Sequence, residues 1–275
     1  MIQDVLGIAK LSENNLEMIK LIYPDVAQPA VRKVGIALET VFDFANTILL
    51  PLKLLNDKSK VFFQKHMENY KKKIDELNTE EIGNVPPEMG LPILDELTKT
   101  TNDNIAELFI NLLLSSSSID KSKNAHPSFI NVIKNLSSDE AKIIQYLIES
   151  NKERFLLVSF SRKDIDNQIV ELSDSYSSIL DLNIDYIENH AFYARNLINL
   201  GILSENRHLY FQTEIEEYDP LIKKLDFVKE HKLNLLRNLD DSDYIKKSSI
   251  ITNKGVLKLT EFGKEFIKAV SAKKS

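Results

Sequence analysis

Residues 126–148, HPSFINVIKNLSSDEAKIIQYLI, predict two helices that meet at a well-specified corner. Pro127 fits the first turn of a helix, where its missing N–H leaves no hydrogen bond unmade. Apolar side chains then follow at i, i+3, i+4 and i+7, the spacing of one buried helical face. These four side chains are Phe129, Val132, Ile133 and Leu136.

The second helix has its own start signal. Ser137 and Glu140 match a capping box, in which the hydroxyl and the carboxylate each accept a backbone N–H at the start of the helix. Asp139 and Glu140 also suit the positive end of the helix dipole. The buried stripe that follows is Ile143, Ile144, Leu147 and Ile148. We therefore expect a short helix and a longer one here. They join an N-terminal helical half to a C-terminal half in which helical and strand patterns are mixed.

This stretch, together with segments before it, resembles the abortive infection alpha family of bacterial phage-defence proteins. The segments that carry the resemblance lie in the family's order: VPPEMGLPILDEL at 85–97, IAELFINLLLSSS at 105–117, HPSF at 126–129 and LSSDEAKII at 136–144. The resemblance runs from about residue 34 to the end and is strongest over 85–147. It implies a role in abortive infection. It is a pattern of helices and caps, so it points to no catalytic residue.

Bulk composition narrows the class of protein. The chain has 275 residues, 43% of them hydrophobic and 28% charged, which is ordinary for a globular protein of one large or two smaller domains. Seven glycines are few, which favours helices. The absence of cysteine excludes disulfides and thiolate chemistry and fits a reducing cytosol. MIQDVLGIAKLSENN at the start has too short an apolar run for a signal peptide, so we expect a cytoplasmic protein.

These patterns predict a mainly α protein with two parts. Residues 1–125 form an N-terminal helical domain, with a Gly- and Pro-rich linker near 78–90. Residues 126–275 form a C-terminal winged-helix-like α+β domain.

Residues 31–55 are the most hydrophobic stretch, and within it residues 34–55 predict an amphipathic helix packed into a core. The apolar face of this helix comprises Val34, Leu38, Val41, Phe42, Ile48 and Leu49. At about 22 residues the segment approaches membrane-spanning length, so an alternative is an effector that contacts a membrane through this face. Glu39 and Asp43 lie near its middle and are costly in hydrocarbon, which disfavours that alternative.

The C-terminal half mixes helical and strand patterns. Residues 155–158 suit a short strand or a buried helical end, and residues 164–180 a helix. Residues 186–200 predict a helix that ends before Gly201, and residues 208–216 alternate as in a strand. The rest predicts a helix over 220–238, a β-hairpin over 249–259 that turns at Asn253-Lys254-Gly255, and a last helix capped by Thr260.

This order of elements resembles a winged-helix module. RNLINLGIL at 195–203 and LKLTEFGKEFI at 257–267 look like the corresponding ends of that module in bacterial regulators. The helix over 186–200 would be its recognition helix, and Asn and Arg can read base edges. Its outward side chains form a candidate nucleic-acid or partner face: Asn189, Phe192, Arg195, Asn196 and Asn199.

Charge argues against nucleic acid as the ligand of this face. The net charge of the chain is −6, and Asp181, Asp185 and Glu188 crowd the start of the helix. Binding to DNA requires clustered Lys and Arg that neutralise phosphates. A protein partner or a second copy of the chain is therefore favoured, and a winged-helix DNA-binding regulator is kept as an alternative.

The sequence shows no motif for a reaction. The five histidines, His66, His126, His190, His208 and His231, fall in no metal-binding spacing, and there is neither a phosphate-binding loop nor a G-x-S-x-G elbow. We therefore assign no catalytic, metal-binding or cofactor-binding residue and expect a non-enzymatic protein without a cofactor. A catalytic triad assembled from distant residues stays open, because such triads are recognised by geometry.

Overall fold

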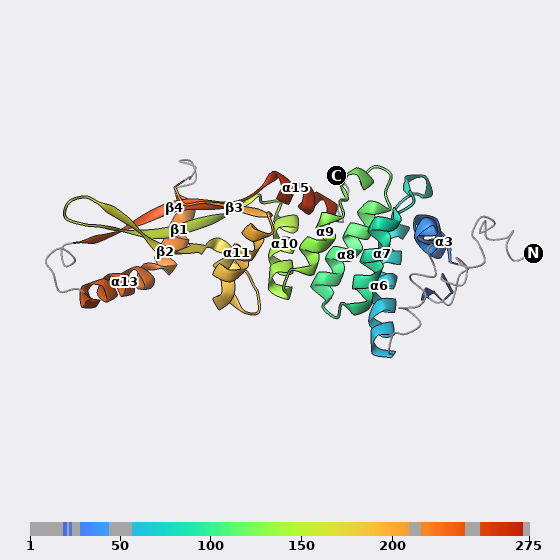
Figure 1. Cartoon of the computed structure of the whole chain (residues 1–275), viewed down its shortest axis with the longest axis horizontal. Helices are drawn as coiled ribbons and strands as arrows, with labels where there is room; N and C mark the ends of the chain where they lie inside the picture. The colour runs from blue at the N-terminus through green and yellow to red at the C-terminus, as the bar shows by residue number, and fades with distance from the viewer. Residues whose placement is uncertain are drawn as a thin grey trace, which may run out of the picture. The chain divides into compact units, whose positions relative to one another are not determined.

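The computed structural model describes residues 19–20, 22–23, 28–43, 57–208, 216–239 and 248–271 (Figure 1). Contacts divide the chain into two compact units. Unit 1 is Met1–Lys142 with Glu265–Ser275, and unit 2 is Ile143–Lys264. The sequence predicts a division between residues 125 and 126. The prediction of a mainly α protein with an α+β region toward the C-terminus is confirmed.

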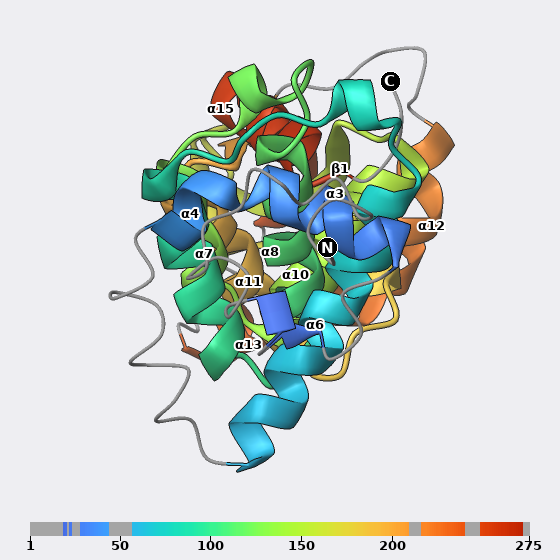
Figure 2. The same cartoon turned by 90° about the vertical axis from the view of Figure 1, so that its right-hand side faces the viewer.

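Unit 1 is built from helices. Helices α6 (Asp57–Asp75), α7 (Pro87–Lys99) and α8 (Asp103–Ser116) pack against one another, with α3 (Pro29–Ala37) on α6 and α4 (Glu39–Asp43) on α7 (Figure 2). Its shorter elements are η1 (Thr79–Glu81), η2 (Ser122–Asn124) and α9 (Ser128–Lys134). The boundaries between the units fall inside α10 (Ser138–Ser150) and α15 (Glu261–Ala269).

The corner predicted from 126–148 is present. The Ser137 N–H donates to Glu140 Oε2 at 2.7 Å, and the Glu140 N–H donates to Ser137 Oγ at 3.3 Å, so the capping box is confirmed. The four apolar side chains of the first helix are buried. Within unit 1, the ring of Phe129 meets that of Phe266 edge-on, with centroids 5.5 Å apart. This contact packs α9 against α15.

The hydrophobic segment 34–55 was expected to be one helix. Its described part is instead two helices, which are interrupted at Leu38. The carbonyl of Ala37 accepts the Val85 N–H at 2.8 Å, and the Thr40 hydroxyl donates to the Val85 carbonyl at 2.7 Å. The backbone of Val85, in the segment between η1 and α7, therefore hydrogen-bonds to both sides of the break. Residues 44–56 lie outside the described part of the chain.

Unit 2 is built on a four-stranded antiparallel sheet of order β2-β1-β4-β3 (Figure 1). Strand β1 pairs with β4 from Arg154↔Lys258 to Lys163↔Ser249, and with β2 from Leu157↔Ser177 to Lys163↔Ile169. The strands are β1 (Arg154–Lys163), β2 (Ile169–Ser177), β3 (Leu203–Asn206) and β4 (Ser249–Leu259). The helical elements are η3 (Ser178–Asp181), η4 (Ile187–Asn189), α11 (His190–Asn199), α12 (Asp219–Lys224) and α13 (Asp226–Leu239).

Helices α12 and α13 cover a core on the sheet. Val158 and Phe160 of β1 and Ile250 of β4 are buried there against Leu221 and Leu225. The expected single helix over 220–238 is divided at Leu225 into α12 and α13. The core side chain Leu225 thus lies between two helices that both contribute to the same apolar cluster.

The helix expected over 164–180 is wrong, because a turn and strand β2 occupy this segment. Asp164 Oδ1 accepts the N–H groups of Asp166 at 3.0 Å and Gln168 at 2.8 Å. Asn167 takes a left-handed conformation with φ 61°. This Asx-type turn reverses the chain, so that β2 pairs back on β1.

The hairpin expected over 249–259 is also wrong, because β4 is one continuous strand. Both halves of it pair with the single strand β1. Gly255 serves close approach and not a turn: a Cβ atom there would lie 2.3 Å from the carbonyl oxygen of Asn206. The glycine therefore permits β3 and β4 to meet.

Two helix-boundary signals predicted from the sequence are confirmed. Gly201 follows α11 with φ 77°, as a helix C′ residue requires. The Thr260 hydroxyl accepts the Gly263 N–H at 2.8 Å at the start of α15. Residues 209–215 of the expected strand 208–216 lie outside the described part, and the winged-helix resemblance stays a prediction.

Replacing Gly255 with alanine should destabilise unit 2 by about 1–3 kcal/mol, because the added methyl group meets backbone atoms that cannot turn away. Gly83→Ala is the matched control, since its added Cβ meets only the Ile119 side chain within 3.4 Å. Urea denaturation followed by circular dichroism measures both. An equal shift for the two variants would contradict the close-approach role of Gly255.

Candidate functional site

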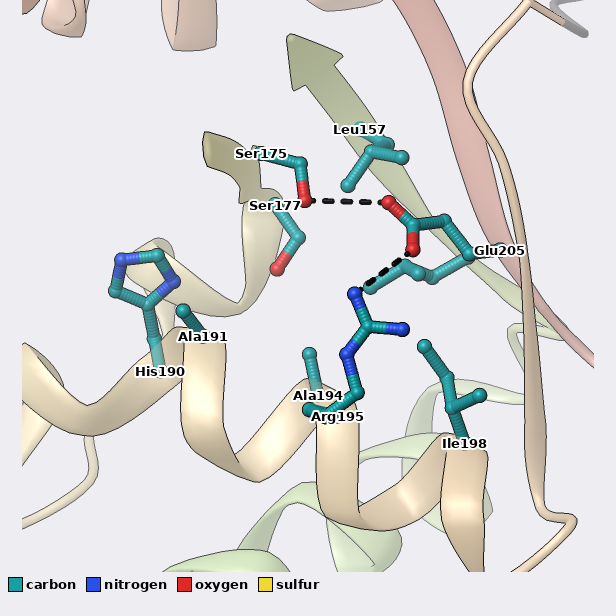
Figure 3. A pocket seen from close by; sticks show the side chains of 10 residues that line it. Leu157, Ser175, Ser177, His190, Ala191, Ala194, Arg195, Ile198 and Glu205 are labelled. Atoms are coloured by element: carbon teal, nitrogen blue, oxygen red, sulfur yellow. Dashed lines mark hydrogen bonds and ion pairs between the residues drawn. The ribbon is translucent and has the colours of Figure 1, made fainter. Parts of the chain in front are cut away.

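A small polar pocket lies in unit 2 between β2, α11 and β3 (Figure 3). Its volume is about 20 Å³, which is about the space of one water molecule. Five polar side chains line it: Ser175, Ser177, His190, Arg195 and Glu205. His190 lies at one end and Glu205 at the other, so that a base, a carboxylate, a guanidinium and two hydroxyls converge on one small space (Figure 3).

Glu205 accepts hydrogen bonds from three side chains at the pocket. Its carboxylate accepts from Ser175 Oγ at 3.2 Å, from Arg195 Nη2 at 3.3 Å and from Arg207 Nε at 2.9 Å. The Glu205 side chain is 14% exposed, whereas that of Arg195 is 56% exposed. The carboxylate is thus neutralised by two guanidinium groups, one of which reaches it from the solvent side of α11. The half-exposed Arg195 pair is screened by water and stabilises the fold only weakly.

Two further polar residues, His190 and Ser177, line the pocket. Both residues are buried, and among the described residues neither His190 Nδ1 nor Ser177 Oγ has a hydrogen-bond partner. Burial, and after it the Lys224 ammonium, lower the pKa of His190 below its ordinary value of 6.5. The imidazole is therefore neutral at pH 7 and can either accept or donate one hydrogen bond into the pocket.

Two larger hollows each have a lining charge that is already paired. One, of about 490 Å³, lies in unit 1 beside the ends of α6 and α8, where Lys73 is paired with Glu107. The other, of about 620 Å³, lies in unit 2 beside the stacked rings of Tyr146 and Phe155, and its Asp181 is paired with Lys224 at 3.2 Å. Neither hollow is lined by one of the buried side-chain atoms that lack a partner in the described part of the chain. The pocket at His190 is therefore the stronger candidate site.

The predicted partner face lies on and beside α11. Asn189, Phe192, Arg195 and Asn199 are exposed and Asn196 is half-buried, with the Phe192 side chain 68% exposed. The structure brings one of the five, Arg195, into the pocket. Ser175, Ser177, His190 and Glu205 were missed. The alternation S-Y-S over 175–177 is the signal that could have found Ser175 and Ser177, because alternate residues of a strand share one face.

The predicted membrane face has a different environment. Val34, Leu38, Val41 and Phe42 are fully buried inside unit 1, and Ile48 and Leu49 lie outside the described residues. Of the helices in the described part, none combines the length and the apolar character needed to cross a bilayer. In this conformation the four described residues form core and not surface.

Fold and site together describe a helical protein that carries a curled antiparallel sheet and a small polar pocket. The chain matches the family model for abortive infection alpha over residues 62–270, which is most of its length, so the protein belongs to that family. The resemblance drawn from 85–147 is thereby confirmed, and the family indicates a role in abortive infection, a form of phage defence.

Two further comparisons add little. The chain has no match among curated proteins. A solved structure, that of an uncharacterized protein from the hydrocarbon-degrading marine bacterium Alcanivorax borkumensis SK2, is 15% identical. The match covers 56% of this chain and 97% of that one, with a TM-score of 0.31.

The stability of unit 2 should depend on the protonation of His190. Because the pKa of His190 is lowered in the folded state, the unfolded chain binds the proton more readily below pH 6.5. Wild type should therefore lose stability relative to His190→Gln as the pH falls from 7.5 to 5.5. Urea denaturation at the two pH values measures this difference. His126→Gln, which replaces an exposed histidine of unit 1, is the control, and a pH-independent difference for His190→Gln would contradict the assignment.

Val41→Asp should unfold unit 1, because it buries an unpaired charge at a cost of about 3–5 kcal/mol. Val61→Asp is the control, since the Val61 side chain is 64% exposed, and it should leave the urea midpoint nearly unchanged. If Val41→Asp instead kept the wild-type midpoint and lost co-flotation with lipid vesicles, the segment would act at a membrane surface and not in the core.

Proposed function

We propose that the protein acts in bacterial defence against phage by abortive infection, in the cytoplasm, by binding a protein partner and without catalysing a reaction. The observation that carries the setting is the family match over 62–270, which extends through both units. The binding mode rests on the surface of α11, and the absence of a reaction rests on the character of the pocket behind it.

Helix α11 has the composition of a protein-binding face. Its inner side chains, including Tyr193 and Leu197, are buried, whereas Phe192 projects outward with 68% exposure. Its ring meets that of Tyr193 edge-on, with centroids 6.3 Å apart, which holds it against the helix. Aromatic and Arg side chains dominate the energetics of protein interfaces, and asparagines supply polar contacts around them.

The charges around this face favour a protein over a nucleic acid. Asp185 and Glu188 are exposed just before α11, and Arg195 is already paired with Glu205. A phosphate backbone would meet these acids and would gain only a shared guanidinium.

The pocket supports binding over catalysis because of its size and its pairing. At about 20 Å³ it holds no substrate-sized space, and its one carboxylate is occupied by two arginines. The hydrogen bonds from Ser175 and Arg195 to Glu205 connect β2 and α11 to β3. Satisfied polar contacts of this kind help to fix one arrangement of the elements.

Phe192→Ser should weaken partner binding about thirtyfold, and protection against phage with it, because loss of an interface anchor costs on the order of 2 kcal/mol of binding. The measurement is the efficiency of plating on cells that carry the gene, with a phage that wild type restricts. Val61→Ser is the control, since Val61 is as exposed as Phe192 but lies on α6 of unit 1.

Thermal melting of each purified variant separates loss of the face from loss of the fold. If Phe192→Ser protected like wild type while Ser177→Ala and the His190→Gln variant lost protection with unchanged melting, the pocket would carry a reaction and the binding proposal would fail.

A further inference from the structure

Two buried polar atoms in the pocket at His190 require a hydrogen-bond partner. His190 Nδ1 and Ser177 Oγ both belong to residues that line it, and neither atom bonds to any described residue (Figure 3). His190 is 8% exposed and Ser177 is 2% exposed, so bulk solvent does not satisfy them. Folded proteins pair nearly all such groups, because a buried donor or acceptor without a hydrogen bond destabilises the fold. The two atoms therefore point to a ligand that both can bind.

The positions of the two residues indicate a bridge. Ser177 is the last residue of β2, and His190 is the first residue of α11. Since both line one pocket and do not bond to each other, they face a common space across which they make no direct hydrogen bond. A molecule that bonds to two such groups at once joins them nearly as well as a direct hydrogen bond does.

The size of the pocket limits what this molecule is. The volume is about 20 Å³. A cavity needs at least about 10–15 Å³ by the same measure to hold one water molecule. The pocket therefore has room for one water molecule and none for an organic ligand.

The charges in the pocket favour a neutral ligand over an ion. Of the described residues that line it, the charged ones are Arg195 and Glu205, which have opposite signs and lie 3.3 Å apart as an ion pair. A further ion would bring an unpaired charge out of water, which is costly. The ligand must also suit a hydroxyl and a neutral imidazole nitrogen, and water both donates and accepts.

We propose that the pocket is a binding site for one water molecule, which bridges Ser177 Oγ at the end of β2 to His190 Nδ1 at the start of α11. Buried waters make about three hydrogen bonds, and Ser175 or Glu205, which line the same pocket, supplies the third. The site goes beyond the proposed function and does not depend on it, because the water would be bound whether or not α11 contacts a partner.

Two substitutions of the same shape test the site in the full chain. Threonine and valine at position 177 differ in one respect, since threonine keeps the hydroxyl that valine replaces with a methyl group. With water bound, Ser177→Val should have an equilibrium constant for folding about tenfold below that of Ser177→Thr, because the methyl group leaves the water and His190 short of a hydrogen bond. Urea denaturation followed by circular dichroism measures both.

The same pair of substitutions at Ser161 of β1 is the matched control. The Ser161 residue is fully buried, and its hydroxyl accepts from Asn253 Nδ2 at 2.7 Å. Ser161→Val should therefore also be less stable than Ser161→Thr, which sets the size of the difference for a hydroxyl with a known partner.

A crystal structure of the wild-type full chain locates the water directly. It should show a solvent peak about 2.7–3.2 Å from both His190 Nδ1 and Ser177 Oγ. Two results would overturn the proposal. One is a pocket without such a peak at a resolution that shows other buried waters. The other is Ser177→Val as stable as Ser177→Thr or more so, since removal of a hydroxyl that has no partner stabilises the fold. Neither measurement involves plating, so failure here is distinguishable from failure of the α11 proposal.

Discussion

Unit 2 depends on the pairing of β1 with β4. The ten pairs from Arg154↔Lys258 to Lys163↔Ser249 join segments that lie about 90 residues apart in the chain. Everything between them is placed by that ladder: β2 extends one side of it, and β3 extends the other. The loop-closure cost of such distant pairing is recovered only when the apolar side chains of both strands are covered. Helices α12 and α13 supply that cover over Val158, Phe160 and Ile250.

Local signals in the sequence predicted the helices well and the strands poorly. The capping box at Ser137 and Glu140, the buried row that begins at Phe129 and the left-handed Gly201 are confirmed, because each depends on residues within a few positions of one another. The turn predicted at Gly255 is wrong, because the atom that requires a glycine there, the carbonyl oxygen of Asn206, belongs to a distant strand.

The same distinction applies to the pocket. Helical periodicity identifies Arg195 as an outward-facing residue. Periodicity does not identify its partner Glu205, since nothing near Arg195 in the sequence indicates which acid the curl of the sheet will bring to it. His190 has a polar side chain that is buried in the fold. The burial of a polar residue can be recognised only once the packing is known.

The pocket is best understood as the support of the α11 surface. His190 begins α11 and lies beside Tyr176 of β2, with ring centroids 6.0 Å apart, while Arg195 reaches Glu205 of β3 one and a half turns later. These contacts fix both the position and the rotation of the helix, and therefore the direction in which Phe192 projects. The lowered pKa of His190 means that this support is strongest while the imidazole is neutral. In the proposed function, the polar groups of the pocket therefore serve to orient the α11 surface.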